Sequence, residues 1–267
     1  MFIVRVRYPA GCERLATTTG WFVALCDSST YFYPNYKTNL TYPPMLTRNN
    51  DTFTWLDYNR RSDEQSPLLV MLHGYGSNEK DLISLAPALD SRLRVVSVRA
   101  PLVLAPEMYG WFPIEFTPGG IIVDREAARQ MADKLVAFLE NLIEKLQPTG
   151  KKTFLMGFSQ GSVMSYLTAF RNPELLHGVL ALSGQLPDGR PETDALPTRL
   201  AEVPFLVQHG LFDDVLPIDR GRQADAWLRD KIADYTYREY PMAHQIDQES
   251  LEFMASWLSG RIDRVMS

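Results

Sequence analysis

The chain has 267 residues, of which 45% are hydrophobic and 22% charged, with 27 basic and 32 acidic side chains. This composition is typical of a globular protein and excludes wholesale disorder, a collagen-like repeat and a coiled coil. The net charge of −5 and the lack of a basic stripe argue against a nucleic-acid partner. No apolar run reaches the roughly 20 residues that would allow stable membrane insertion.

The first part of the chain differs in pattern from the rest. Residues 28–50 show no sustained helical or strand period, and prolines and asparagines interrupt them. We expect residues 1–50 to form an N-terminal extension, poorly ordered or outside the fold, and residues 51–267 to form one α/β domain. A start codon placed upstream of Met45 would explain residues 1–44, and an ordinary N-terminal decoration of the domain would explain them equally well.

The cysteines and the N-terminal residues indicate a cellular compartment. Cys12 and Cys26 are the two cysteines of the chain, too few for a disulfide framework or a metal site. The first apolar stretch is not a good signal peptide, because Arg5 and Arg7 interrupt it. These features predict a cytoplasmic protein with no bound metal.

From Pro67 onward, short apolar segments alternate with amphipathic ones. A strand is predicted at 53–59, where it would form an edge, and further strands at 67–72, 93–98, 152–157, 179–182, 203–208 and 235–240. Helices are predicted at 81–90, at 124–147 with Asp124 as its cap, and at 160–170, 217–232 and 247–258. This alternation predicts an α/β fold with a mainly parallel sheet and helices on both faces.

The sharpest motif is Gly157-Phe-Ser159-Gln-Gly161, which lies between a predicted strand and a predicted helix. That setting is the one a nucleophile elbow requires. The two glycines avoid clashes in a tight turn. The turn projects the hydroxyl of Ser159 into the cleft, and it directs the N–H of Gln160 at the substrate carbonyl. The alternative is a glycine-rich turn with an inert serine.

A serine needs a base to act as a nucleophile, and the base in turn needs an orienting acid. Where such a turn is used, the order along the chain is serine, acid, histidine. His244 follows the last predicted strand and is the best candidate base, against the alternative of a surface histidine. Asp213 and Asp214 follow the strand before it. We predict that Asp213 is the acid and that its neighbour is a helix cap or a solvated charge.

A further cluster, His73-Gly-Tyr75-Gly-Ser-Asn78, follows the first long strand. Glycines let a backbone approach a ligand closely. A loop at this position can supply one of the two N–H donors of an oxyanion hole. We predict that the donors are the N–H groups of Tyr75 and Gln160, against the alternative of a plain strand-to-helix turn.

Together these segments, with Tyr109-Gly-Trp-Phe112, His209-Gly-Leu-Phe-Asp213 and Ala243-His244, resemble the phospholipase/carboxylesterase family of α/β-hydrolases. The resemblance runs from about residue 66 to the end of the chain. It implies an α/β-hydrolase fold without a large cap domain, no cofactor, and a catalytic triad of Ser159, Asp213 and His244. A similar aromatic segment lines the acyl site in the family, which implies that Trp111, Phe112 and Leu211 form an apolar slot for substrate. The alternative is that they only pack their loop onto the body of the domain.

The activity expected from this resemblance is that of a serine carboxylesterase acting on small-to-medium acyl chains. An acyl-protein thioesterase or a lysophospholipase would use the same triad, so these activities stay open, as does a peptidase on the same fold. A more distant alternative is a non-catalytic binding protein on a hydrolase scaffold. The family contains dimers, so a homodimer is an expectation as well.

Overall fold

The computed structural model describes residues 45–59, 66–117, 120–148, 152–188 and 196–266. The chain divides into two units, Met1–Thr41 and Tyr42–Ser267, and all described residues belong to the second. Residues 1–44 of the predicted extension 1–50, with both cysteines, lie outside the described residues.

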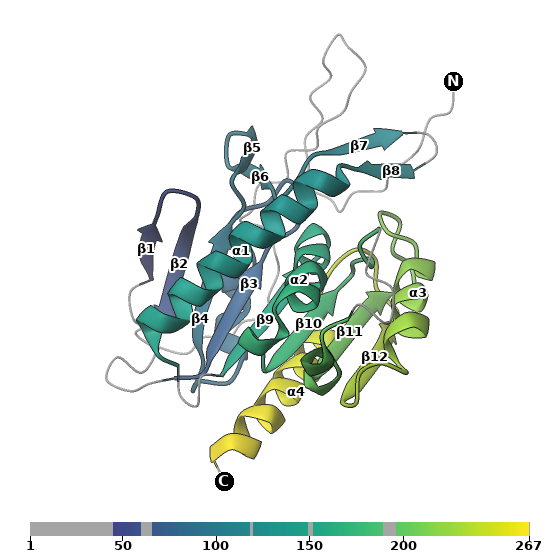
Figure 1. The fold of residues 1–267 in the computed structure, drawn as a ribbon. Coiled ribbons are helices and arrows are strands. Elements are labelled where there is room, and N and C mark those ends of the chain that lie inside the picture. The colour runs from purple at the N-terminus through teal and green to yellow at the C-terminus, as the bar shows by residue number, and fades with distance from the viewer. Residues whose placement is uncertain (1–44, 60–65, 118–119, 149–151, 189–195, 267) are drawn as a thin grey trace. The chain divides into compact units, whose positions relative to one another are not determined.

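An eight-stranded sheet runs through the described residues in the order β1-β2-β4-β3-β9-β10-β11-β12 (Figure 1). The pairs from β4 to β12 are all parallel, whereas β1 and β2 pair antiparallel with their neighbours. Its strands are β1 (Leu46–Asn49), β2 (Thr54–Asn59), β3 (Leu68–Leu72), β4 (Arg94–Arg99), β9 (Thr153–Phe158), β10 (Gly178–Leu182), β11 (Phe205–Gly210) and β12 (Tyr235–Tyr240).

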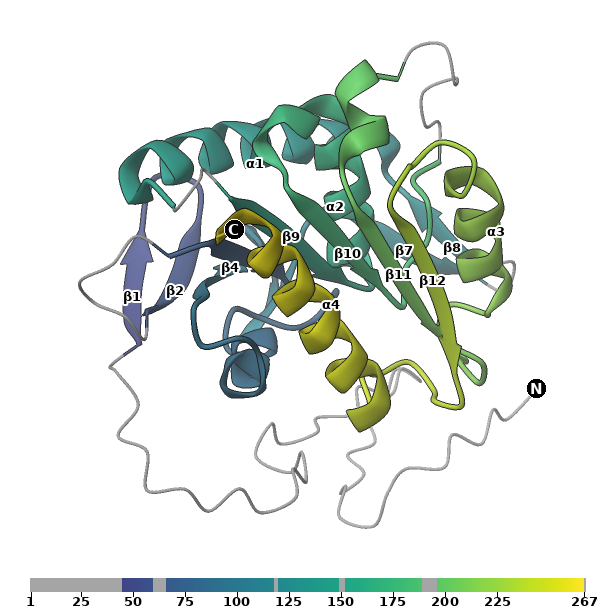
Figure 2. The same cartoon turned by 90° about the horizontal axis from the view of Figure 1, so that it is seen from below.

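Helices cover both faces of this sheet. One face carries α1, α2 and α3, and the other carries η1 and α4 (Figures 1 and 2). The helical elements are η1 (Leu82–Ala88), α1 (Arg125–Leu146), α2 (Gln160–Arg171), η3 (Pro173–Leu175), η5 (Thr198–Glu202), α3 (Asp219–Leu228) and α4 (Gln248–Met266). Helix α1 begins where predicted, because the Asp124 carboxylate accepts a hydrogen bond from the N–H of Ala127 at 2.9 Å.

The sheet separates two apolar cores. All five residues of β3 are buried, and they alternate between the core under α1 and α2 and the core under η1 and α4. A parallel strand covered on both faces needs such a continuous apolar run. The same requirement explains the apolar runs of β9, β10 and β11, whose carboxyl ends lie at one edge of the sheet.

Three short antiparallel elements were not predicted. Strand β1 forms the edge of the sheet, so β2 is an inner strand and the prediction of an edge strand over 53–59 is wrong. The sheet therefore begins at Leu46, within the predicted extension 1–50. Two hairpins lie between β4 and α1: β5 (Leu102–Ala105) with β6 (Met108–Gly110), and β7 (Ile114–Thr117) with β8 (Gly120–Val123).

No large helical cap is inserted between the strands in the described part of the chain. Nor does any helix among those residues have the length and apolar character needed to cross a membrane.

Candidate active site

Ser159 occupies the tight turn between β9 and α2. Its φ of 54° and ψ of −114° lie outside the regions that a serine ordinarily adopts. Its N–H donates to the carbonyl of Leu182 at the end of β10, at 2.9 Å, which holds the strained turn against the sheet. Strain of this kind, in a turn from strand to helix, is the geometry of a nucleophile elbow.

The glycines that flank this turn are required by their surroundings. A Cβ on Gly157 would lie 2.1 Å from the carbonyl oxygen of Gly161. A Cβ on Gly161 would lie 2.0 Å from the carbonyl oxygen of Leu72 in β3. Both neighbours are backbone atoms that cannot rotate away, so helix α2 can start this close to the sheet only without side chains at these positions.

Asp213 and His244 form a hydrogen-bonded pair beyond the ends of β11 and β12. The Nδ1–H of His244 donates to Oδ2 of Asp213 at 2.8 Å. The other carboxylate oxygen, Oδ1, accepts the N–H groups of Val215 at 3.0 Å and Leu216 at 2.8 Å. Burial raises the pKa of Asp213, but hydrogen bonds from His209, His244 and the Leu216 N–H outweigh it, so this pKa lies well below its usual range.

The two adjacent aspartates differ in burial and in contacts. The side chain of Asp213 is fully buried against His244, whereas Asp214 is exposed. A second imidazole also faces the carboxylate: Nε2–H of His209 donates to the Leu216 carbonyl at 2.7 Å and lies 3.4 Å from Oδ2 of Asp213. The sequence did not predict this position for His209, because the residue is recognisable there only as a histidine at the end of a strand.

The serine, the histidine and the loop after β3 converge at the carboxyl edge of the sheet. The ring of His244 lies 4.9 Å from the ring of Phe158, the residue before Ser159. A Cβ on Gly74 would lie 3.3 Å from Cβ of Ser159, so the loop after β3 passes directly beside the serine. Residues from the ends of β3, β9, β11 and β12 therefore surround one location, as expected for ligand sites in open parallel sheets.

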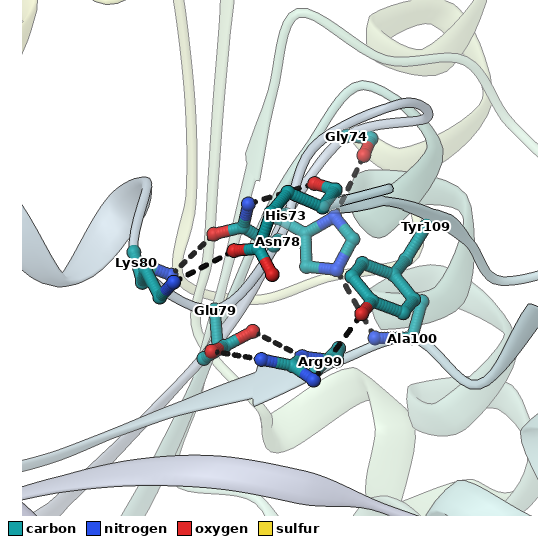
Figure 3. A network of polar contacts seen from close by, with 9 residues as sticks. His73, Gly74, Asn78, Glu79, Lys80, Arg99, Ala100 and Tyr109 are labelled. Carbon is teal, nitrogen blue, oxygen red and sulfur yellow. Dashed lines mark hydrogen bonds and ion pairs between the residues drawn. The ribbon is translucent and has the colours of Figure 1, made fainter. Parts of the chain in front are cut away.

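His73 holds the start of that loop (Figure 3). Its Nε2 accepts the N–H of Ala100 at 3.0 Å, which leaves Nδ1 as the protonated nitrogen that donates to the Gly74 carbonyl at 2.7 Å. Its own carbonyl accepts the indole N–H of Trp111 at 2.8 Å. The fully buried imidazole is therefore a neutral structural bridge between β3, β4 and the segment after β6.

The structure predicts a pH dependence of stability from this ring. Burial lowers the pKa of His73 below its ordinary value of 6.5. The neutral ring then stabilises the fold fully above pH 6.5, and this contribution is lost as the pH falls from there through the lower folded-state pKa. We expect the free energy of unfolding, measured with urea, to fall between pH 7.5 and 5.5. The slope should be smaller in His73→Gln, and an unchanged slope would contradict the prediction.

A family model agrees with this arrangement. The model described as "Phospholipase/Carboxylesterase" matches residues 59–262, which is most of the chain. The chain belongs to the phospholipase/carboxylesterase family. The resemblance predicted from the sequence motifs is therefore confirmed.

Individual members of the phospholipase/carboxylesterase family are distant relatives. A probable carboxylesterase of rice, Oryza sativa subsp. japonica, is 27% identical over 165 residues, 58% of this chain, and the chain spans only 59% of that protein. Acyl-protein thioesterase 1 of Gibberella zeae is 25% identical over 217 residues, covering 74% of this chain and 91% of that protein.

Solved structures agree on the fold. The crystal structure of esterase PE8 superposes with a TM-score of 0.68 and 28% identity, covering 76% of this chain and 96% of that one. The Bacillus cereus carboxylesterase gives a TM-score of 0.67 at 23% identity, covering 79% of this chain and 96% of that chain. The predicted α/β-hydrolase fold without a large cap is thus confirmed.

The three side chains of this chain that we expect to bind substrate differ in their exposure to solvent. Trp111 and Phe112 are 1% and 2% exposed and pack in the core under α1 and α2. Leu211 is 38% exposed, and its neighbours Phe212 and Val215 are 67% and 46% exposed on either side of the buried Asp213. The apolar surface open to solvent beside the acid is thus formed by the 211–215 loop, and contact of Trp111 and Phe112 with substrate stays a prediction.

Gln160 has a second role that the sequence did not indicate. Its buried side chain accepts the N–H of Trp111 through Oε1 at 2.7 Å and donates through Nε2 to the carbonyl of Phe112 at 2.8 Å. The side chain thereby joins the start of α2 to the segment after β6. Sequence reasoning considered only the backbone N–H of this residue, and an alternating or helical pattern contains no signal for such an amide bridge.

We expect Gln160→Ala to lower the free energy of unfolding by about 2–4 kcal/mol, because it leaves two buried backbone groups without a partner. Chemical denaturation of wild type and variant measures the difference. Gln130→Ala is the matched control, since Gln130 makes one exposed hydrogen bond to Glu126 on the surface of α1. Equal stability losses in the two variants would contradict the bridging role.

Proposed function

We propose that this chain is a serine hydrolase that cleaves carboxylic esters through an acyl-enzyme. Ser159 is the nucleophile, His244 the general base and Asp213 the acid that orients it, while the backbone N–H groups of Tyr75 and Gln160 form the oxyanion hole. The observation that supports this proposal most strongly is the 2.8 Å hydrogen bond between His244 and the buried Asp213, at the same sheet edge as the strained Ser159 turn.

The reaction follows from the tautomer of His244. Because Nδ1–H donates to Asp213, Nε2 is free of a proton and accepts the hydrogen of the Ser159 hydroxyl as the oxygen attacks the ester carbonyl. The resulting imidazolium protonates the departing alkoxide. Water then attacks the acyl-enzyme by the same route, returning the proton to Ser159.

Helix α2 supports the developing charge on the carbonyl oxygen. The N–H groups in the first turn of a helix have no acceptor within the helix, and the helix dipole favours negative charge at that end. Gln160 is the first residue of α2. The loop residue Tyr75 follows Gly74, whose backbone lies against Ser159, and supplies the second donor. Each such donor contributes about 3–4 kcal/mol to the transition state.

An uncharged acyl ester is the substrate class that we favour. Leu211, Phe212 and Val215 present apolar surface beside the catalytic acid, which suits an acyl chain. Relatives include proteins named carboxylesterase and acyl-protein thioesterase, so a thioesterase is the second candidate. Lysophospholipase activity, a homodimer and location in the cytoplasm stay predictions from the sequence.

Hydrolysis of p-nitrophenyl esters from acetyl to palmitoyl, and of matched acyl thioesters, tests this proposal. We expect turnover of the esters, with a chain-length optimum that sizes the acyl site, and stoichiometric labelling of Ser159 by a fluorophosphonate. Faster turnover of the thioesters would favour the thioesterase. Failure of both turnover and labelling would contradict the proposed function and favour a binding protein.

A further inference from the structure

Strand β4 begins and ends with an arginine, and each arginine holds a buried carboxylate. At the amino end, Arg94 binds Asp57 of β2 through Nε at 2.9 Å and Nη2 at 2.6 Å. At the carboxyl end, Arg99 binds Glu79 through Nε and Nη2, both at 2.5 Å. Asp57 also accepts a hydrogen bond from Nε of Arg48 at 2.8 Å, so Arg48 holds this carboxylate together with Arg94. Both carboxylates are buried, but only the Glu79–Arg99 pair lies at the end of the sheet that carries the proposed active site.

The Glu79–Arg99 pair closes the loop that carries the proposed oxyanion donor Tyr75 (Figure 3). This loop runs from His73 to Glu79. At the start of the loop, the ring of His73 accepts the backbone N–H of Ala100. At its end, the carboxylate of Glu79 binds the side chain of Arg99, the residue before Ala100. The two ends of the loop are therefore attached to consecutive residues, Arg99 at the end of β4 and Ala100 directly after it, which limits how far the segment between them can move.

Arg99 also touches the hairpin that supports the middle of the loop. Its Nη1 donates to the hydroxyl of Tyr109 at 3.3 Å, and its guanidinium carbon lies 4.7 Å from the centre of that ring. The backbone of Tyr109 exchanges hydrogen bonds with the loop, accepting the N–H of Gly76 at 2.8 Å and donating to the carbonyl of Ser77 at 2.9 Å. One guanidinium thus connects the end of the loop with the strand that supports its middle.

The carboxylate of Glu79 is held as an anion. Burial raises its pKa, but the hydrogen bonds and positive charge of Arg99, a backbone hydrogen bond and the charge of Lys80 together outweigh it, so the pKa of Glu79 lies below its usual value. Removing one member of such a pair leaves a buried charge without a partner. We expect the loop to rearrange so that this charge reaches water, and the oxyanion donor Tyr75 to move with it.

We propose that Glu79 and Arg99 are positioning residues that fix the oxyanion loop in the orientation required by the transition state. This inference rests on the proposed function. Neither side chain needs to touch the substrate. Their effect on the reaction arises because an oxyanion donor stabilises the transition state only when it is already aimed at the developing charge.

The test compares Glu79→Gln with Asp57→Asn, which weakens the buried contacts of a carboxylate with Arg94 and Arg48 at the other end of β4. We expect Glu79→Gln to lower kcat for a p-nitrophenyl ester by about 10–100-fold with little change in KM, since a small misplacement of a catalytic group has effects of this order. Binding of an aryl trifluoromethyl ketone, which forms an oxyanion adduct with a serine, should weaken in proportion. Asp57→Asn should lower thermal stability but leave kcat within about threefold of wild type.

Two further measurements separate positioning from loss of fold. Arg99→Lys keeps the positive charge and loses the two-pronged contact, so its kcat should fall between those of wild type and Glu79→Gln. Amide hydrogen exchange of residues 74–78 should be faster in Glu79→Gln than in Asp57→Asn, at equal protection of β9 and β10.

Unchanged kcat and unchanged loop exchange in Glu79→Gln would overturn the inference, as would equal loss of kcat in Asp57→Asn. Failure of the proposed function has a different signature, because the wild type would then hydrolyse no ester. The exchange rates of the loop would still show whether the Glu79–Arg99 pair holds it.

Discussion

Replacing Ser159 with alanine is expected to lower kcat for ester hydrolysis by about 10⁴–10⁶, because the acyl-enzyme can no longer form and only the oxyanion donors and substrate binding remain. Alanine keeps the Cβ, so the strained turn and its hydrogen bond to Leu182 are retained. The change therefore tests chemistry and not folding. Steady-state kinetics on the best p-nitrophenyl ester, together with fluorophosphonate labelling, measure the loss.

Ser162→Ala is the matched control for this variant. Ser162 is fully buried in the first turn of α2, three residues after Ser159. We expect the control to keep kcat within a few-fold of wild type and to be labelled normally. Equal activity in Ser159→Ala and wild type would mean that another residue is the nucleophile.

Replacing Asp213 with asparagine is expected to lower kcat by about 10⁴, the loss typical of an orienting carboxylate changed to its amide. Oδ1 accepts the backbone N–H groups of Val215 and Leu216, so the asparagine keeps its oxygen there and presents its NH₂ group to the histidines. Nδ1 of His244 must then accept, which moves the ring proton to Nε2. In that tautomer the ring cannot accept the proton of Ser159.

Asp214→Asn separates the two adjacent aspartates. Asp214 has the same charge and the same chemistry one position further along, but it is exposed to solvent. We expect its kcat to stay within about twofold of wild type at neutral pH. A large loss in Asp214→Asn with a small loss in Asp213→Asn would contradict the geometry described above, and the pH profile of kcat/KM would show which variant has lost the base.

The long elements of the fold were predictable because one physical pattern dominates each of them. Continuous apolar runs predicted β3, β9 and β10, and the apolar stripe of α1 with its Asp124 cap predicted the longest helix. Strand β1 and the hairpins β5–β6 and β7–β8 have only three or four residues in each strand, too few for an alternating pattern to emerge. Their pairing is decided by the neighbours that the fold brings to them.

The candidate site shows the same division. The glycines around Ser159 indicated a turn, because their spacing is a local feature. The order of residue types along the chain indicated Asp213 and His244, because each follows a predicted strand. The contact between His209 and Asp213, the amide bridge of Gln160 and the pair of Glu79 with Arg99 join residues from different segments. Such contacts depend on three-dimensional arrangement, and no spacing in a single sequence encodes them.

The distribution of the site along the chain has a consequence for biosynthesis. The loop after β3 and the serine turn after β9 leave the ribosome well before β11 and β12, which precede the proposed acid Asp213 and the proposed base His244. Pairing between distant parallel strands is slow, because each pairing closes a long loop of chain. On the proposed function, esterase activity during synthesis is therefore expected only after β12 has joined the sheet.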